Sequence, residues 1–251
     1  MTWCDPHAFP ALAGLGHSIR WQPLACTGSP GDAPAPQLWL MDLDGEGPRT
    51  LLDCLQPDEH ARADRFHQAL HARRFRHGRA LLRHILAELC GLRPSELRLM
   101  AGAHGKPFLA HQPGWRFNLS HSGRWALLIT HERLELGIDL ECHHDMPDRH
   151  QVAERIMGAA EFAAFSALPE AQHASAFLHC WTRKEALLKA LGLGFMMEPD
   201  QIDLHGAMHL ASQGGHQTLV HEGQAHHLRW QDVPLPADCP ALACAAWLAS
   251  G

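Results

Sequence analysis

The sequence predicts an α+β protein built from two subdomains. Two stretches, residues 69–90 and 171–191, carry apolar residues at helical spacing, and each lies among short apolar runs that are typical of strands. Helices and strands therefore occur in a similar ratio on either side of residue 135. We expect an N-terminal extension or linker over residues 1–36, a first α+β subdomain over 37–135 and a second over 136–251.

The elements follow in order along the chain. Residues 28–36 are rich in glycine and proline, which predicts a loop, and we expect 1–36 to be peripheral. A strand is predicted over 38–43, and Pro57 with the two acids that follow it predicts the start of a helix. Gly91 and Gly192 end the two long helices. Further strands are predicted over 97–100, 115–119, 125–130 and 134–140, and weaker ones near 202–204, 219, 228–230 and 242–247.

The composition is that of a soluble globular protein, with 46% hydrophobic and 19% charged residues. A net charge of −6 argues against a nucleic-acid partner held by bulk charge. The eight cysteines show no C-x-x-C spacing, so we expect reduced thiols and a cytoplasmic protein. We predict no signal peptide, and the longest strongly apolar run, 241–249, is too short to span a membrane.

Two carboxylates lie close together in the segment Gly137-Ile-Asp-Leu-Glu141. On a strand, Asp139 and Glu141 face the same side, with Cα atoms roughly 6–7 Å apart. They repel each other unless a cation lies between them, and Mg²⁺ prefers hard oxygen ligands of this kind. A solvated strand end explains the same residues equally well.

Glu185 and Lys189 are one helical turn apart in the second long helix. This spacing is that of an ordinary surface ion pair. Trp181 lies one turn earlier on the same strip, however, which indicates a partly buried face and favours an acid–base or metal site. Lys106, Lys184 and Lys189 are the only lysines, and a compact ammonium suits a phosphate contact or proton transfer.

Two further segments suit phosphate. Residues 117–123, Phe-Asn-Leu-Ser-His-Ser-Gly, offer hydroxyls, an imidazole and backbone N–H groups at the end of a predicted strand, although a plain β-turn has the same composition. Seven arginines lie between Arg62 and Arg83, with a single acid, Asp64. They form either a solvated helix face or a patch for phosphate or for an acidic protein. The 22 histidines form no zinc-finger pattern with the cysteines.

In their order along the chain, these segments resemble the Sfp-type 4′-phosphopantetheinyl transferases. That family has a G-[IV]-D-x-E element followed by a helix with the pattern W-[ST]-x-K-E-[AS]-x-x-K. Here residues 137–141 precede Trp181-Thr-Arg-Lys-Glu-Ala-Leu-Leu-Lys189 at the distance that is typical of the family. Gly105-Lys-Pro107 and residues 117–123 match two upstream family segments, and the resemblance covers residues 38–248.

The resemblance implies the family's fold, an α+β pseudo-dimer of two similar subdomains with coenzyme A in the cleft between them. It also implies transfer of the 4′-phosphopantetheine group from coenzyme A to a serine of an apo acyl or peptidyl carrier protein. The other product of that reaction is 3′,5′-ADP. Because one chain supplies both walls of such a cleft, we expect a monomer.

The resemblance assigns a role to individual residues. Asp139, Glu141 and Glu185 are expected to hold Mg²⁺, with Glu185 and Lys189 as the catalytic residues. The expected coenzyme A contacts, with the arginines on the 3′-phosphate, are Arg62, Arg74, Lys106, Ser120, His121 and Lys189. Glu59 stands where some family members have a lysine, which implies one phosphate contact fewer.

Three other functions agree with parts of the sequence. A hydrolase or another transferase of nucleotide diphosphates would use the same Mg²⁺ site, but neither a P-loop nor a G-x-G-x-x-G segment follows a predicted strand. An inactive module that binds coenzyme A or carrier proteins disagrees with the retention of Asp139, Glu141, Glu185 and Lys189. A nucleic-acid binder would depend on the arginine-rich helix against an acidic remainder.

Overall fold

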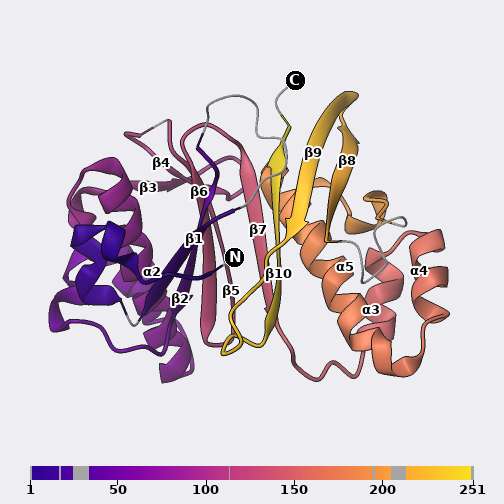
Figure 1. The fold of residues 1–251 in the computed structure, drawn as a ribbon, viewed down its shortest axis with the longest axis horizontal. Helices are drawn as coiled ribbons and strands as arrows, with labels where there is room; N and C mark the ends of the chain where they lie inside the picture. The colour runs from indigo at the N-terminus through magenta and orange to yellow at the C-terminus, as the bar shows by residue number, and fades with distance from the viewer. Residues whose placement is uncertain are drawn as a thin grey trace.

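The computed structural model describes residues 2–16, 18–24, 34–112, 114–193, 196–204 and 213–249. In this part of the chain, two antiparallel four-stranded sheets pack against each other, and a long helix covers the outer face of each (Figure 1). The strand order is β1-β2-β6-β5 in the first sheet and β7-β10-β9-β8 in the second. The predicted α+β class is confirmed.

The first sheet consists of β1 (Ile19–Pro23), β2 (Gln37–Asp42), β5 (Arg116–Ser122) and β6 (Trp125–His131). The second consists of β7 (Leu136–Cys142), β8 (Gly214–His221), β9 (Gln224–Asp232) and β10 (Ala241–Leu248). A small hairpin pairs β3 (Leu99–Ala101) with β4 (Pro107–Leu109). The α-helices are α1 (Pro57–Ala63), α2 (Ala69–Cys90), α3 (Arg149–Ile156), α4 (Ala159–Ser166) and α5 (Glu170–Leu191). The 3-10 helices are η1 (Pro6–Ala8), η2 (Pro10–Leu15), η3 (Arg49–Cys54), η4 (Pro94–Glu96) and η6 (Pro199–Gln201).

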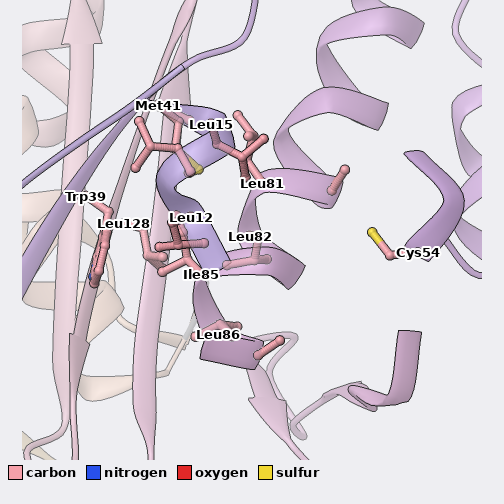
Figure 2. Packing of buried hydrophobic residues seen from close by; sticks show 14 of the residues in the cluster. Leu12, Leu15, Trp39, Met41, Cys54, Leu81, Leu82, Ile85, Leu86 and Leu128 are labelled. Atoms are coloured by element: carbon pink, nitrogen blue, oxygen red, sulfur yellow. The ribbon is translucent and has the colours of Figure 1, made fainter. Parts of the chain in front are cut away.

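Helix α2 packs on the outer face of the first sheet. The predicted helix over 69–90 is confirmed, and Gly91 ends it in the left-handed conformation with a φ of 65°. The contact is made by buried apolar side chains of α2, β2 and β6 (Figure 2), among them Leu81, Leu82, Ile85, Leu86, Trp39, Met41 and Leu128. None of the helices in the described residues has the length and apolar character needed to cross a bilayer.

A second core lies between the two sheets. Alternate side chains of β2 and β6 point away from α2 and meet alternate side chains of β7 and β10. The members of this inter-sheet core include Leu38, Leu40, Leu127, Ile129, Ile138, Leu140, Ala243 and Ala245. Because β2 and β6 are buried on both faces, their sequences are continuous apolar runs. The order of the layers is therefore helix, sheet, sheet, helix.

Helix α5 covers the outer face of the second sheet and lies very close to β7. A Cβ placed on Gly137 would be 2.2 Å from the carbonyl oxygen of Ala186 and 2.3 Å from the backbone nitrogen of Ala190. A residue without a side chain is therefore needed where the two backbones meet. This close approach brings Asp139 of β7 within hydrogen-bond distance of Lys189 on α5.

A buried ion pair ties α5 to α3 and α4, two short helices that the sequence pattern does not predict. Lys184 and Glu161 are each 1% exposed, and Lys184 Nζ lies 2.6 Å from Glu161 Oε2. The Lys184 ammonium also donates to the carbonyl oxygens of Ile156 and Pro199, so all three of its protons are used. Lys184 therefore supports the fold and is not available to a phosphate.

Part of the segment 1–36 belongs to the core, in contrast to the expectation that it is peripheral. Strand β1 pairs with β2, and Leu12, Leu15 and Ile19 are buried in the core beneath α2. Trp3 donates a hydrogen bond to the carbonyl oxygen of Pro234, in the second half of the chain. These apolar residues stand among glycines and polar residues without a periodic pattern, which is why the sequence does not predict their burial. The division into subdomains at residue 136 stays a prediction.

We predict that Gly137→Ala lowers the free energy of unfolding by about 3 kcal/mol or more, because the added methyl group meets backbone atoms that cannot rotate away. Urea unfolding followed by circular dichroism measures this change. Gly14→Ala is a matched control, since apart from its chain neighbours and its own helix backbone no described atom lies within 4 Å of the position that its Cβ would take. Equal stability of the two variants would contradict the close approach of α5 to β7.

Candidate active site

The two sheets meet at one edge, where β5 of the first lies beside β7 of the second. Side chains of β5 make the connection. Asn118 accepts a hydrogen bond from the backbone nitrogen of Ile138 at 2.9 Å, and Ser120 donates to Asp139 Oδ1 at 2.9 Å. Ser122 donates to Glu141 Oε2 at 2.9 Å. We call this contact the β5–β7 seam. It unites two sequence segments, 117–123 and 137–141, that each suit phosphate or a cation.

Lys189 lies at the centre of the seam. Its ammonium donates to Asp139 Oδ1 at 2.5 Å and to Ser120 Oγ at 3.3 Å, and it is 4.0 Å from Glu185 Oε2. Asp139 is 2% exposed, and its second oxygen, Oδ2, has no hydrogen-bond partner within the described residues. A buried carboxylate oxygen without a donor is costly, so this atom is a candidate ligand for a cation.

The three predicted metal ligands repel one another. Burial raises the pKa of Glu185, and the negative charges of Asp139 and Glu141 raise it further, while Lys189 opposes the shift. Burial and the charge of Asp139 likewise raise the pKa of Glu141, against hydrogen bonds from Ser122 and Trp181. Each of these two glutamates therefore costs energy to ionise in the folded protein. A bound cation would remove that cost.

The described histidine, cysteine and acidic side chains nevertheless form no group of three arranged to hold a metal ion. Asp139 is paired with Lys189, and Glu141 is held by Ser122. The structure therefore brings Asp139, Glu141 and Glu185 into electrostatic contact without arranging them as a finished ligand set. The partnerless oxygen of Asp139 and the mutual repulsion of the carboxylates both fit a hard divalent cation.

Two adjoining cavities flank this seam. One has a volume of about 540 Å³ and is lined by Lys106, Trp181, Glu185 and Lys189, among others. The other has a volume of about 580 Å³, and its lining includes Arg62, Arg74, Phe75 and His121. Pro107 and Leu119 line both cavities, so the two adjoin, and we call them together the groove. The predicted catalytic pair and most of the predicted coenzyme A contacts therefore line the same groove.

Lys106, which we expect to contact phosphate, already has hydrogen-bond partners in the protein. Its ammonium donates to Glu135 Oε2 at 3.1 Å and to the carbonyl oxygens of Leu136 and Ala190 at 3.1 and 3.2 Å. Burial lowers the pKa of Lys106, and Glu135 partly offsets this. All three donors are engaged, so a phosphate contact requires the exchange of one of these bonds. Lys106 thus fastens the β3–β4 hairpin region to β7 and α5.

The arginine-rich stretch divides into internal and groove-facing residues. Glu59 is 3% exposed and accepts from Arg79 and Arg83 on α2 at 2.8 Å each. Arg83 is therefore internal, whereas Arg79 is tied to the same acid but still lines the groove. These bonds, with one from the backbone of Gln56, outweigh the effect of burial and lower the pKa of Glu59. Glu59, which the family resemblance places at a phosphate-contact position, is therefore part of an internal ion pair in this chain.

The groove-facing arginines also have partners. Arg62 is exposed and lies over the ring of Phe75, with 5.2 Å from its guanidinium carbon to the ring centre. Arg74 forms a bidentate pair with Asp44, in the turn after β2. Sequence reasoning missed Asp44, because an acid after a strand carries no periodic or motif signal, and only the fold brings it to α2.

Comparisons with known proteins agree with this arrangement. Residues 135–244 match a family model described as the 4′-phosphopantetheinyl transferase superfamily, and residues 47–133 match one described as 4′-phosphopantetheinyl transferase, N-terminal. The 4′-phosphopantetheinyl transferase HetI of Nostoc sp. is 38% identical over 162 residues, which cover 62% of this chain and 68% of HetI.

More distant relatives carry the same description. The 4′-phosphopantetheinyl transferase psf-1 of Bacillus pumilus is 33% identical, over 62% of this chain and 67% of psf-1. The 4′-phosphopantetheinyl transferase Sfp of Bacillus subtilis is 26% identical, over 64% of this chain and 71% of Sfp.

We predict that Glu185→Gln stabilises the metal-free protein near neutral pH. Because the folded state raises the pKa of Glu185 above its ordinary value of 4.5, the ionised group destabilises the fold once the pH exceeds that value. The gain should be present at about pH 7 and should vanish as the pH falls below about 4.5, where the group is protonated in both states. Urea unfolding in a chelator across this pH range measures it. A stabilisation that does not depend on pH would contradict the electrostatic cause.

Proposed function

The chain belongs to the 4′-phosphopantetheinyl transferase superfamily, and we propose that it carries out the superfamily's transfer reaction at the β5–β7 seam. The enzyme moves the 4′-phosphopantetheine group from coenzyme A to a serine of an apo acyl or peptidyl carrier protein. The products are the holo carrier protein and 3′,5′-ADP. The main support is a cluster of four side chains, Ser120, Asp139, Glu185 and Lys189. In this cluster Glu185 and Lys189 line the groove, and Lys189 contacts the buried carboxylate of Asp139.

In the proposed reaction, the serine hydroxyl of the carrier attacks the phosphorus that bears the pantetheine arm. The bond from that phosphorus to the oxygen of 3′,5′-ADP breaks. Glu185, which lines the groove beside Lys189, takes the serine proton. Lys189, with its ammonium at the seam, stabilises the negative charge on the phosphate oxygens as the leaving group departs.

We propose that Asp139, Glu141 and Glu185 hold Mg²⁺. The support is the partnerless oxygen of Asp139 and the raised pKa values of the two glutamates. When bound, Mg²⁺ neutralises charge on the diphosphate and on the transferring oxygens.

Coenzyme A is proposed to lie along the groove. Arg62, Arg74 and His121 line one end, which suits the 3′-phosphate and its nucleotide. Lys106, Ser120 and Lys189 lie toward the seam, where the diphosphate is proposed to bind. Both walls of the groove come from one chain, so we propose a monomer. The free thiols of the described cysteines agree with the proposed cytoplasmic location.

The first functional prediction concerns Glu185. Glu185→Gln should lower kcat by at least about 100-fold while the protein stays folded. This is the lower end of the range expected when a general base is lost. Production of holo carrier, followed by mass spectrometry, measures the rate. Glu170→Gln, in the first turn of the same helix, is the matched control and should keep normal activity. Rescue of Glu185→Gln by excess Mg²⁺ would show that Glu185 is only a metal ligand and not the base.

The second functional prediction concerns the 3′-phosphate. Arg74→Ala should raise KM for coenzyme A by about 10- to 100-fold, because a charge-assisted contact is lost. KM for 3′-dephospho-coenzyme A should change by less than about twofold, since that donor lacks the phosphate. Arg76→Ala is the control, because Arg76 pairs with Asp64 and does not line the groove. Equal losses for both donors would remove Arg74 from the 3′-phosphate site.

A further inference from the structure

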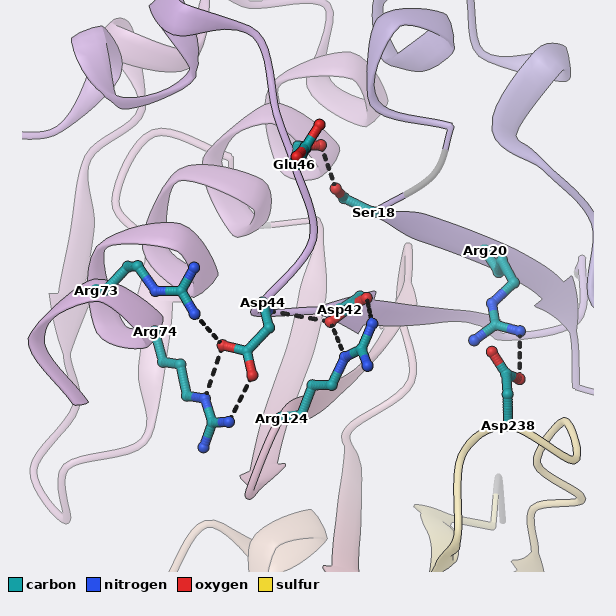
Figure 3. Close-up of polar contacts among 9 residues, drawn as sticks. All are labelled: Ser18, Arg20, Asp42, Asp44, Glu46, Arg73, Arg74, Arg124 and Asp238. Atoms are coloured by element: carbon teal, nitrogen blue, oxygen red, sulfur yellow. Dashed lines mark hydrogen bonds and ion pairs between the residues drawn. The ribbon is translucent and has the colours of Figure 1, made fainter. Parts of the chain in front are cut away.

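Asp44 lies in the turn after β2 and contacts two consecutive arginines of α2 (Figure 3). Its Oδ1 accepts from Arg73 Nη2 at 2.7 Å and from Arg74 Nε at 3.0 Å. Its Oδ2 accepts from Arg74 Nη2 at 2.5 Å. The carboxylate and the Arg74 guanidinium therefore meet as two parallel forks, a geometry that fixes the orientation of the arginine plane.

The turn that carries Asp44 is itself held in place. The backbone nitrogen of Asp44 donates to Asp42 Oδ1 at 3.0 Å. Arg124 donates two hydrogen bonds to the same Asp42 carboxylate, from Nε at 2.7 Å and from Nη2 at 2.5 Å (Figure 3). From the other side, Ser18 of the N-terminal segment donates to the carbonyl oxygen of Glu46 at 2.9 Å. The turn thus holds Asp44 in place, and Asp44 in turn holds the guanidinium of Arg74.

The pair leaves Arg74 able to bind an anion. Asp44 uses the Nε proton and one Nη2 proton, so three of the five guanidinium donors stay available. Arg74 lines the groove, whereas Asp44 is not among the lining residues, so the carboxylate lies behind the arginine and not in the space of a ligand. Asp44 also pairs with Arg73, and the three groups together keep a charge of +1.

Asp44 stays ionised at neutral pH. The hydrogen bond from Arg74, assisted by the charges of Arg74 and Arg73, lowers the pKa of Asp44 despite its partial burial. The side chains of Asp44 and Arg74 are 22% and 21% exposed, so the pair is partly shielded from water and salt. The arginine is therefore held by a charged partner before any donor arrives.

We propose that Asp44 is a positioning residue, which orients Arg74 toward the 3′-phosphate and so sets the preference for coenzyme A over 3′-dephospho-coenzyme A. This inference rests on the proposed function, in which Arg74 contacts that phosphate. A free arginine side chain loses much rotamer freedom when it binds a phosphate. Asp44 imposes that restriction in the free enzyme, so less freedom is lost on binding.

The test compares the two donors at saturating carrier protein. Asp44→Ala should raise KM for coenzyme A by about three- to tenfold, the range expected when one long side chain must be ordered on binding. KM for 3′-dephospho-coenzyme A and kcat with either donor should change by less than about twofold. Asp44→Asn keeps the shape and one acceptor and should show a smaller effect in the same direction, which guards against misfolding of the alanine variant.

Two further variants test whether Asp44 acts through Arg74. Asp44→Ala combined with Arg74→Ala should be no worse than Arg74→Ala alone, because Asp44 acts only through that arginine. Glu96→Ala removes a surface carboxylate that pairs with Arg93 at 2.6 Å and should leave both KM values unchanged.

Each contrary result has a distinct meaning. A lower KM for coenzyme A in Asp44→Ala would overturn the inference and make Asp44 a competitor of the phosphate. Equal changes for both donors would overturn it in favour of a purely structural turn. If Arg74→Ala itself fails to distinguish the donors, the proposed site of the 3′-phosphate is wrong and the inference falls with it. If only the Asp44 variants fail to distinguish them, the proposed function stands without this inference.

Discussion

The arrangement of the site depends on the contact between the edges of β5 and β7. Three side chains of one strand, Asn118, Ser120 and Ser122, take the place of a regular backbone ladder and bond the neighbouring strand. The same contacts that hold the two halves together also fix Asp139 and Glu141. The geometry of the proposed site and the assembly of the two halves therefore depend on the same contacts. A change at the seam that loosens the fold also displaces the carboxylates that we assign to the metal.

The fold makes different uses of groups that look alike in the sequence. Lys184 is buried and fully bonded, Lys106 braces the hairpin region, and Lys189 lies at the seam beside a carboxylate with one unused oxygen. The arginines divide in the same way, since Arg83 is internal while Arg74 reaches the groove from a rigid support. In each case the partner decides the role, and charge alone does not.

Sequence reasoning predicted the elements that have strong periodicity and the residues that lie in motifs. The helix over 69–90 and the β7 segment with Asp139 follow from spacing and from apolar runs that two packed faces require. It failed for Leu12 and Ile19, which are buried singly, and for α3 and α4, whose short lengths give little signal. Asp44 and the Glu59 pair were out of reach because their partners come from distant parts of the chain. Such contacts exist only once the sheets and α2 are packed.

The inter-sheet core imposes an order on protein synthesis. The first sheet is complete when β6 has emerged from the ribosome, but its inner face then exposes Leu38, Leu40, Leu127 and Ile129. The strands that cover this face, β7 and β10, are translated later, and β10 lies between β7 and β9 in its sheet. A nascent chain that pauses between β6 and β10 therefore presents an apolar surface of the kind that aggregates or recruits chaperones. Slow codons in this interval would prolong that exposure and lower the yield of folded enzyme without changing a single amino acid.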